Sequence, residues 1–391
     1  NLPVGGGVRL FHVVFAVAAA GLLYALARRR LRVPLDRLVP PELAIFLVVM
    51  LASLAGCVDL IEGGRLVTQV AFLLACFAIL RAWGFLEGHR EEFFRTMDRV
   101  MIAGSFALAV LGLIIYVAHL TGFTHDLFPI ILSGFLPRLH FSEDPNHYAG
   151  FMLPGLIMSF PGGKDQPRSL WRKMAFGVIL FAYILTISAG GFLTLGLLAV
   201  LMFFRFRFIT PVRLTAVLLI GGMAYAGLAL SGALDTQTMV LDSVFNQKSA
   251  SSGERLVTWQ YALAMGLSNP LLGVGPDNAK LFVPRAFVSG VPQDIHNGFL
   301  QIFAELGFTG LFLILVVIGR AIYNTWAVIK DPKIERRLTD RGYRYLTLLL
   351  CTCFGHAFLN ILNTPPLWYA LAVNFILVDA LPKLRNQQGV A

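Results

Sequence analysis

Charged residues are scarce in this chain. Only 14% of its 391 residues are charged, against roughly a quarter in an ordinary soluble domain. By contrast, 57% are apolar and the mean hydropathy is +0.72. A soluble protein of this length has too little interior to cover so much apolar surface. No short repeat accompanies the composition, so disordered, collagen-like and coiled-coil chains are excluded as well. A polytopic membrane protein is the class that remains.

Cysteine is also scarce, and metal-binding patterns are missing. The four cysteines lie in apolar stretches, and Cys351-x-Cys353 lacks the further Cys or His ligands of a zinc site. The histidines and carboxylates at 140–147 do not have a spacing that metal coordination explains. We therefore expect no metal and no cofactor.

Long apolar stretches fill most of the chain. A spanning helix needs about 20 mostly apolar residues, and eleven stretches approach that length. The stretch at 233–296 is long and polar, and no Ser/Gly linker divides the chain. We predict an all-α polytopic membrane protein with about 11–12 transmembrane helices, a single domain over residues 1–391, and one large loop with short amphipathic helices. The predicted spans are 9–27, 42–60, 65–84, 99–120, 146–160, 174–188, 191–205, 213–232, 297–326, 345–362 and 367–380.

Lysine and arginine are distributed unequally between alternate loops. If the loop at 28–40 faces the cytoplasm, the cytoplasmic segments carry 24 Lys and Arg residues and the outer segments carry 7. Cytoplasmic loops are enriched in these residues, so the loop at 233–296 is predicted to be extracytoplasmic. The N-terminus would also lie outside, which predicts a further helix before Asn1. The net charge of +10 follows from this topology and suits anionic membrane lipid, so we predict no nucleic-acid partner.

The polar loop contains a predicted amphipathic helix that carries an arginine. Residues 251–254 have the spacing of a capping box, and apolar residues then recur at helical spacing until 269–270. Arg255 would lie in the first turn, where free backbone N–H groups and a guanidinium can together hold a phosphate. The alternative for Arg255, and for the other outer arginines Arg138 and Arg285, is a solvated loop charge.

A histidine and a polar stripe stand at the start of the ninth span. His296 precedes Asn297, Gln301 and Glu305, which recur every four residues and so share one face of a helix. Polar groups are costly in lipid unless they face a cavity, and a histidine at the mouth of one can act as a general base near neutral pH. A helix-capping histidine is the alternative. His356 belongs to a second polar stripe, which either joins helices or lines a pocket.

Several motifs occur in an order that resembles the O-antigen ligase and polymerase family. The block from His296 to Gly310 is the most specific of them, and Asn146 stands in a Pro-Asn pair like the one that begins a transmembrane helix in that family. The resemblance covers about residues 138–310. The motifs are Asp144-Pro145-Asn146-x-x-Ala149, Gly253-Glu254-Arg255-Leu256-x-x-Trp259, Asn269-Pro270-Leu-Leu-Gly273-Val-Gly275-Pro276-Asp-Asn278 and His296-Asn297-Gly-Phe-Leu300-Gln301-x-x-x-Glu305-Leu306-Gly307-x-x-Gly310.

The resemblance implies a GT-C-like, multi-pass glycosyltransferase of the bacterial inner membrane, with its active site on the periplasmic side. It implies transfer of a glycan from undecaprenyl or another polyprenyl diphosphate to a lipid A–core or glycan acceptor, by an inverting reaction without a metal. The partners expected are the lipid-linked donor, the acceptor and membrane lipid. His296 would be the general base, and Arg255, Arg138 and Arg285 would hold the diphosphate. The polar residues expected in the pocket are Asn146, Asn297, Gln301, Glu305 and His356.

Three alternatives stay open. We favour a ligase, which places the glycan on lipid A–core, over a polymerase, which extends it on a second carrier lipid. A lipid-linked glycan flippase or transporter is the competing class, because Glu305 and His356 could form a proton relay, although no internal repeat is visible. The family commonly has Ser-Arg-Gly where this chain has Ser188-Ala189-Gly190. Either Arg138 or Arg285 replaces that contact, or the chain differs from the family here.

Overall fold

The computed structural model describes residues 3–4, 8–9, 38–86, 90–121, 132–133, 136–139, 145–162, 169–206, 253–283, 294–359 and 362–379. The chain forms two compact units. The first comprises residues 1–100 and 257–391, and the second comprises residues 101–256. Each unit is described by itself below. The predicted spans at 9–27 and 213–232 lie outside the described residues.

Helices coincide with the other nine predicted spans, and the all-α polytopic membrane class is confirmed. The largest differences are at the starts of the fourth and tenth spans, where the helices begin at Arg90 and Arg336, and at the end of the second span, where the helix stops at Ser53. The helices are α3 (Pro41–Ser53), α4 (Leu60–Leu86), α5 (Arg90–Leu120), α6 (Pro145–Ser159), α7 (Leu170–Leu185), α8 (Ala189–Phe206), α11 (Gly298–Lys330), α12 (Arg336–His356) and α13 (Pro365–Asp379).

The remaining regular structure is short. A helix over residues 253–268 occupies the predicted amphipathic segment. Two turns are 3-10 helices, η1 (Leu54–Gly56) and η2 (Ala279–Leu281). Four two-residue strands form two antiparallel pairs, β1 (Pro3–Val4) with β2 (Val8–Arg9) and β3 (Leu132–Ser133) with β4 (Leu136–Pro137).

Four helical segments among the described residues are long and apolar enough to cross a membrane by length and composition. They are Leu60–Gly84, Glu91–Leu120, Ala189–Phe206 and Gly298–Lys330. The apolar helices α3 and α13 are shorter. On α3, the side chains of Ile45, Val48 and Leu51 are each more than half exposed. Such an apolar outer face is costly in water and suits contact with lipid.

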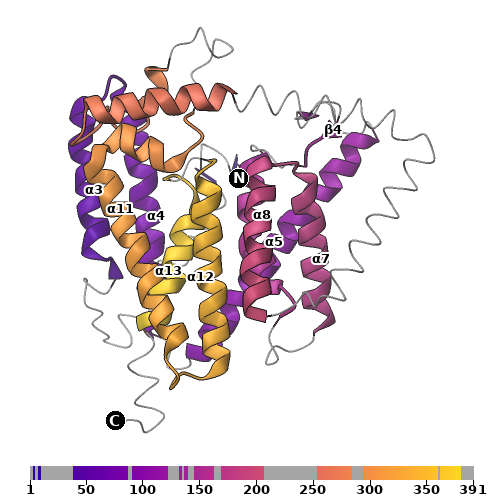
Figure 1. The fold of residues 1–391 in the computed structure, drawn as a ribbon. Coiled ribbons are helices and arrows are strands. Elements are labelled where there is room, and N and C mark those ends of the chain that lie inside the picture. Colours follow the sequence, from indigo (N-terminus) through magenta and orange to yellow (C-terminus); the bar gives the residue numbers. More distant parts are fainter. Residues whose placement is uncertain are drawn as a thin grey trace. The chain divides into compact units, whose positions relative to one another are not determined.

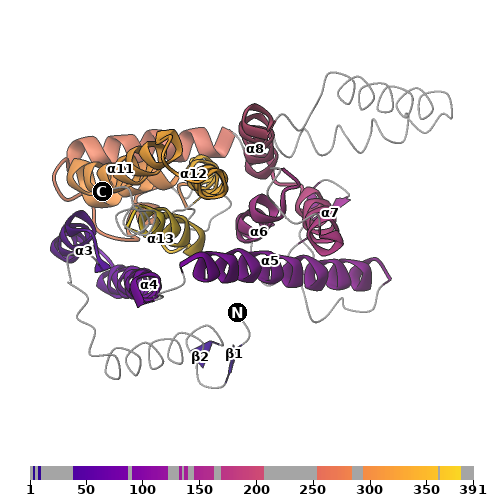
Figure 2. The same cartoon turned by 90° about the horizontal axis from the view of Figure 1, so that it is seen from below.

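In the first unit, α11 is the central helix. It packs against α3, α12 and α13, and α13 also packs against α4 (Figure 2). Helix 253–268 runs crosswise over one end of α11 (Figure 1). Its residues Ala262 and Met265 are buried in a cluster with Ala304 of α11, whereas Leu263 and Leu267 are exposed. The predicted helix therefore forms, but Leu256 is exposed as well, so all three leucines of the predicted apolar stripe are exposed.

Buried ion pairs join the helices at the other end of this unit. Arg81 of α4 pairs with Asp379 of α13 at 2.5 Å. Arg341 of α12 donates hydrogen bonds to Glu91 at 2.7 Å and to Asp98 at 3.4 Å, both on the first turns of α5. The two arginine side chains are less than one-tenth exposed. These contacts connect segments that lie about 250 to 300 residues apart in sequence.

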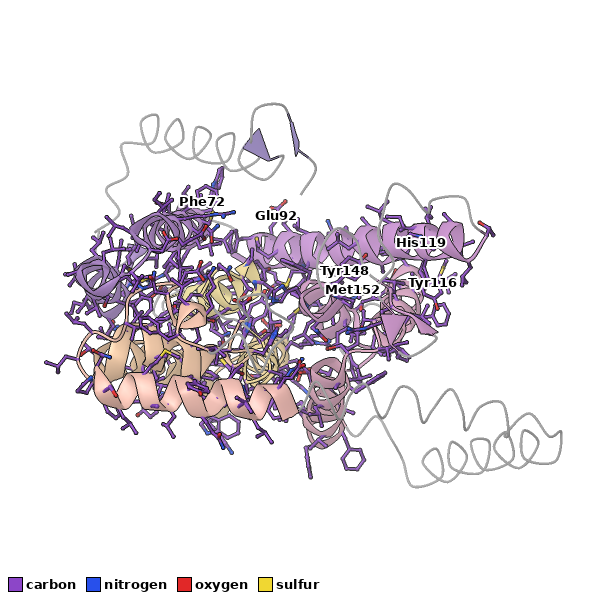
Figure 3. The ribbon with its side chains drawn as sticks, turned by 90° about the horizontal axis from the view of Figure 1, so that it is seen from above. Phe72, Glu92, Tyr116, His119, Tyr148 and Met152 are labelled. Carbon is purple, nitrogen blue, oxygen red and sulfur yellow. The ribbon has the colours of Figure 1, made fainter. Side chains whose placement is uncertain are left out.

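In the second unit, α6 packs against α7 and α8 and approaches α5 closely. The hydroxyl of Tyr148 donates to the carbonyl oxygen of Leu108, and the backbone N–H of Gly155 donates to Ser105 Oγ at 3.0 Å. A Cβ at position 155 would overlap the Ser105 side chain, so this approach depends on glycine. Tyr148 and Met152 lie on the part of α6 that faces α5 (Figure 3).

Candidate functional site

The central helix α11 is interrupted at Gly307. This residue has φ 65° and ψ −167°, a combination that is essentially restricted to glycine. A Cβ there would overlap the carbonyl oxygen of Pro270. The interruption removes helical hydrogen bonds, and in a membrane protein the freed backbone groups need partners within the protein. The span predicted at 297–326 is thus two helical segments that meet at Gly307.

The turn around Gly273 supplies these partners. The N–H groups of residues 274–275 donate to the carbonyl oxygens of residues 304–305, at 2.9 and 3.0 Å. On the other side of the interruption, the N–H of Phe308 donates to the carbonyl oxygen of Pro270 at 2.7 Å. Gly273 has φ 65°, and a Cβ on it would overlap the backbone of residue 305. The motif block at 269–278 and the motif block at 296–310 are therefore interlocked by backbone hydrogen bonds.

Asn278 attaches the same turn to the loop before α4. Its buried side chain donates from Nδ2 to the carbonyl oxygens of Asp59 at 3.0 Å and Pro276 at 2.8 Å, and Oδ1 accepts from the N–H of Asp59 at 2.7 Å. The sulfur of Cys57 lies 3.9 Å from the Pro276 carbonyl oxygen. Burial raises the pKa of the Cys57 thiol, and the nearby charges of Glu305 and Asp59 add to the rise. The turn is thus held from two sides.

The backbone at His296 is held in a strained conformation. Its φ of 51° lies in the left-handed region, which costs a non-glycine residue of order 1–3 kcal/mol. The preceding residue, Ile295, is buried, and its carbonyl oxygen accepts a hydrogen bond from the indole Nε1 of Trp259 at 2.9 Å. Strain of this kind clusters at functional sites, where surrounding contacts maintain it. His296 itself is half-buried.

Asn297, Gln301 and Glu305 lie on one face of α11, in the order that their spacing predicts. Asn297 is the N-cap, with Oδ1 accepting from the N–H groups of Phe299 at 3.2 Å and Leu300 at 3.1 Å. Gln301 donates from Nε2 to Glu305 Oε1 at 3.0 Å. Gln301 is 8% exposed and Glu305 is 1% exposed. Asn297 therefore fixes the start of the helix, and Glu305 fixes the orientation of Gln301.

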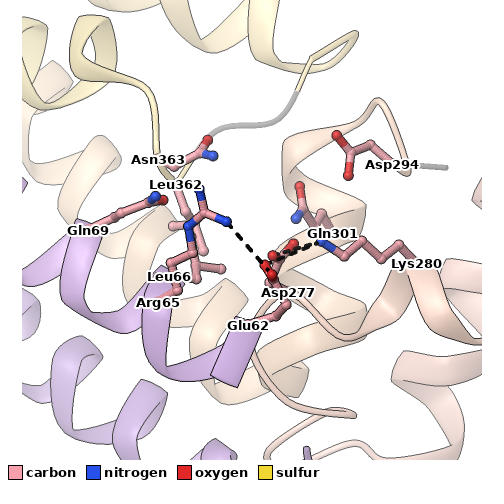
Figure 4. Close-up of a pocket in the computed structure, with 10 residues that line it drawn as sticks. All are labelled: Glu62, Arg65, Leu66, Gln69, Asp277, Lys280, Asp294, Gln301, Leu362 and Asn363. Atoms are coloured by element: carbon pink, nitrogen blue, oxygen red, sulfur yellow. Dashed lines mark hydrogen bonds and ion pairs between the residues drawn. The ribbon is translucent and has the colours of Figure 1, made fainter. Parts of the chain in front are cut away.

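A polar cavity of about 210 Å³ lies in the first unit (Figure 4). The start of α4 forms one wall, and the facing wall is formed by Asp277, Lys280, Asp294 and Gln301. Residues 362–363 complete it. Eight of the ten lining residues are polar. The residues are Glu62, Arg65, Leu66, Gln69, Asp277, Lys280, Asp294, Gln301, Leu362 and Asn363.

Most of the charged residues that line the cavity form ion pairs. Lys280 Nζ lies 2.9 Å from Asp277 Oδ2 and 3.9 Å from Glu62 Oε2, and Arg65 lies 3.7 Å from Glu62 Oε1 (Figure 4). Burial raises the pKa of the Asp277 carboxyl, with Asp294 and Glu62 adding to the rise and Lys280 opposing it. Burial lowers the pKa of Lys280, but the hydrogen bond from Lys280 to Asp277 and the charges of Asp277, Asp294 and Glu62 together raise it overall. Three carboxylates face two cations, so the ionised wall has one negative charge in excess.

His356 supports the cavity wall from behind. It is buried at the end of α12, with Nε2 3.3 Å from Thr364 Oγ1. Thr364 directly follows Leu362 and Asn363, which line the cavity. The indole Nε1 of Trp368 donates to the carbonyl oxygen of Leu362 at 2.9 Å. The second polar stripe thus places the 362–364 turn, and His356 is not one of the residues that line the cavity.

In the second unit, Arg138 and Asn146 are brought together. Arg138 donates from Nη2 to Asn146 Oδ1 at 3.0 Å and from Nε to the carbonyl oxygen of Thr186 at 2.9 Å. Thr186 begins the turn between α7 and α8, in which Ser188 Oγ accepts from the N–H of Gly191 at 3.0 Å. Arg138 therefore lies at the turn where Ala189 stands in place of the expected arginine.

Two further arginines were expected at the site. Arg255 lies in the first turn of helix 253–268, as its motif predicts, and is half-buried. Arg285 lies outside the described residues, as do residues 233–252 of the predicted loop and the Ser251 half of the capping box. The pairs Arg138–Asn146 and Gln301–Glu305 belong to different units.

Some polar residues of the cavity were missed by the sequence reasoning. Glu62 and Gln69 are on α4, and Asp277 precedes Lys280 by three residues. The sequence did contain an indication of this site, because Glu62 and Arg65 are charged residues at the edge of an apolar span, where charges need partners. Their partner Lys280 is more than 200 residues away in sequence, and no local pattern connects the two.

Residues 174–315 match the family described as O-antigen ligase. The match runs from α7 through helix 253–268 and the turn around Gly273 into α11, so it includes both interlocked motif blocks. It confirms the family resemblance derived from the motifs. No curated protein matches the chain.

Proposed function

Because the chain is an O-antigen ligase-like membrane protein, we propose that it transfers a glycan from undecaprenyl diphosphate, or a related polyprenyl diphosphate, to a sugar hydroxyl of lipid A–core. The reaction takes place on the periplasmic face of the bacterial inner membrane. The observation that carries the proposal is the interlocking of the two motif blocks at Gly273 and Gly307, next to a polar cavity. Glycan transfer needs such a cavity, in which hydroxyl-rich groups meet hydrogen-bonding side chains.

The proposed step is a direct displacement at the anomeric carbon of the donor. The acceptor oxygen bonds to that carbon as its bond to the diphosphate breaks, and polyprenyl diphosphate leaves with the bonding electrons. His296 takes the proton of the attacking hydroxyl. Attack from the side opposite the leaving group inverts the anomeric configuration. We assign the stabilisation of the leaving charge to arginine side chains, without a metal.

Arg255, Arg138 and Arg285 are proposed to hold the donor diphosphate. A guanidinium can contact two phosphate oxygens at once, which suits this role. The bond from Arg138 to the carbonyl oxygen of Thr186 supports the idea that Arg138 replaces the arginine missing at Ala189. Arg255 in a first helical turn has the added attraction of the helix N-terminus.

Reconstitution of the full chain tests the proposal. The purified protein is incubated in proteoliposomes with a polyprenyl-diphosphate glycan and lipid A–core, and the product is read as a gel shift. A ligase shifts the lipid A–core band. A polymerase instead lengthens the glycan on the carrier lipid when no lipid A–core is present. Failure to form either product would contradict the proposed function.

Variants of His296 and Arg255 separate their roles. His296→Ala should slow transfer by about 10²–10⁴-fold, because general-base help is lost. His296→Gln keeps a hydrogen-bonding group but takes no proton, so near-normal turnover by this variant would remove the base role. Arg255→Ala should abolish transfer, whereas Arg336→Ala, which removes an exposed arginine at the start of α12, should leave it unchanged.

A further inference from the structure

The cavity has more carboxylates than cations, and each of its cations lies beside a carboxylate. Lys280 and Arg65 lie within ion-pair distance of the Asp277 and Glu62 carboxylates. Asp294 also lines the cavity, and no hydrogen bond to its carboxylate comes from the residues that the structure describes. A ligand that enters therefore meets carboxylate oxygens that accept, together with the amides of Gln69 and Asn363, which can both donate and accept.

Gln301 is the best-defined of these acceptors. Its Nε2 donates to the buried Glu305, so its Oε1 is left for whatever fills the cavity that it lines. Both side chains are more than nine-tenths buried, which fixes the amide in one orientation. Glu305 does not line the cavity; it acts through Gln301 and is a positioning residue.

The charge of the wall determines which ligands fit. Three carboxylates against two cations leave one negative charge in excess when all are ionised. A phosphate or carboxylate offers only acceptor oxygens and negative charge, and like charges in contact are strongly unfavourable. A neutral sugar offers several hydroxyl donors and no charge. The wall thus suits a sugar ring and not an anionic group.

The size of the cavity points to a single sugar residue. Its volume of about 210 Å³ is below the roughly 300–1,000 Å³ of pockets that enclose drug-sized ligands. Leu66 and Leu362 give it a small apolar surface on which the C–H face of a ring can lie. A longer glycan would have to extend beyond it.

We propose that this cavity binds an uncharged sugar residue of the acceptor, whose hydroxyl groups donate to Asp294 and to Gln301 Oε1, and that it rejects phosphorylated sugars. The proposal rests on the glycan transfer proposed above. It also separates the acceptor sugar from the diphosphate of the donor, which the arginines hold.

Binding of small sugars tests the proposal without catalysis. Saturation-transfer NMR on the full chain in nanodiscs compares methyl glycosides of glucose, galactose and N-acetylglucosamine with their 6-phosphates. At least one neutral glycoside should bind, and its 6-phosphate should bind at least about tenfold more weakly. Gln301→Leu and Asp294→Asn should each weaken binding of the neutral sugar by about 3–10-fold. Glu335→Gln, at the exposed residue directly before α12, should leave binding unchanged.

Transfer kinetics separate this proposal from the proposed function. Gln301→Leu should raise the KM for the acceptor and leave the KM for the donor unchanged. Glu305→Leu, which removes the oxygen that accepts from Gln301 Nε2 and so frees the Gln301 amide to turn, should raise the acceptor KM in the same direction. If wild-type protein transfers glycan but these variants keep the acceptor KM, or if the 6-phosphates bind as well as the neutral glycosides, the cavity proposal is overturned. Absence of transfer by wild-type protein would overturn the proposed function. In that case the NMR comparison of neutral and phosphorylated sugars would still test whether the cavity binds an uncharged sugar.

Discussion

The two ends of the first unit use buried charge in different ways. At one end, the side chain of Arg341 is 9% exposed and is bonded to Glu91 and Asp98. At the cavity end, Lys280 is 24% exposed and Arg65 is 61% exposed. Charges at the first end are enclosed by partners from other helices. Those at the cavity end are spaced around an open volume.

The comparison separates a structural role from a binding role. A buried charge that has lost its partner is strongly destabilising, so the enclosed pairs fix which helices lie together. Partly exposed pairs contribute little to stability, so their arrangement around a cavity needs another explanation. We therefore expect changes at the enclosed end to affect folding and changes at the cavity end to affect ligands.

The largest effect on stability is expected for Arg341→Leu. Removal of this guanidinium takes a buried positive charge from Asp98 and Glu91, although Tyr345 still donates to Asp98 at 3.0 Å and Arg95 to Glu91 at 3.1 Å. The free energy of unfolding should fall by about 3 kcal/mol. Thermal unfolding of the detergent-solubilised protein measures the loss. The matched control is Arg337→Leu on the same helix: Arg337 is 44% exposed and lies 4.0 Å from the same Glu91, so it should cost no more than about 1 kcal/mol. Equal losses in the two variants would contradict the distinction between the ends.

A slightly smaller effect is expected for Gly307→Ala. The positive φ should cost about 1–3 kcal/mol, and the added Cβ pushes against the Pro270 carbonyl oxygen. The turn around Gly273 would loosen and transfer would fall with stability. Gly319→Ala on the same helix has open space around its Cβ position and should stabilise by about 0.5–1 kcal/mol. If Gly307→Ala left both stability and transfer unchanged, the interruption of α11 would not be required for either.

The smallest effect is a pH dependence of stability at the cavity. The pKa of Asp277 is raised in the fold, so the folded state binds this proton more tightly than the unfolded state does. The resulting stabilisation is complete below the unfolded pKa and is lost as the pH rises through the folded pKa. Wild-type protein should therefore lose stability relative to Asp277→Asn as the pH rises from about 4. Parallel stability curves for the two proteins would show that Asp277 is not perturbed; Glu335→Gln serves as the control for loss of a carboxylate.

The arrangement of helices along the chain could be predicted from the sequence because span length is a direct consequence of membrane thickness. The start of α11 was readable as well, since Asn297 and the four-residue spacing to Gln301 and Glu305 are local features. Local spacing also put Arg255 in the first turn of helix 253–268.

The cavity was harder to predict because its walls are far apart in sequence. Glu62 and Lys280 lie 3.9 Å apart but belong to opposite halves of the chain. The glycine at position 307 does not by itself predict an interruption of α11, because glycine is common in membrane helices, where it allows close helix packing. The docking of residues 274–275 on residues 304–305 uses backbone groups, which leave no trace in the side-chain pattern.

Cys57 gives the protein a built-in chemical reporter. Its sulfur lies against the Pro276 carbonyl and the Gly275 backbone, so the docked turn covers one side of the thiol. Thiolate is the reactive form, and the raised pKa of Cys57 keeps it scarce at neutral pH. Alkylation of Cys57 by a maleimide should therefore accelerate whenever the turn lifts from α11. The labelling rate in the presence and absence of donor or acceptor would show when, during turnover, the interlocked motif blocks come apart.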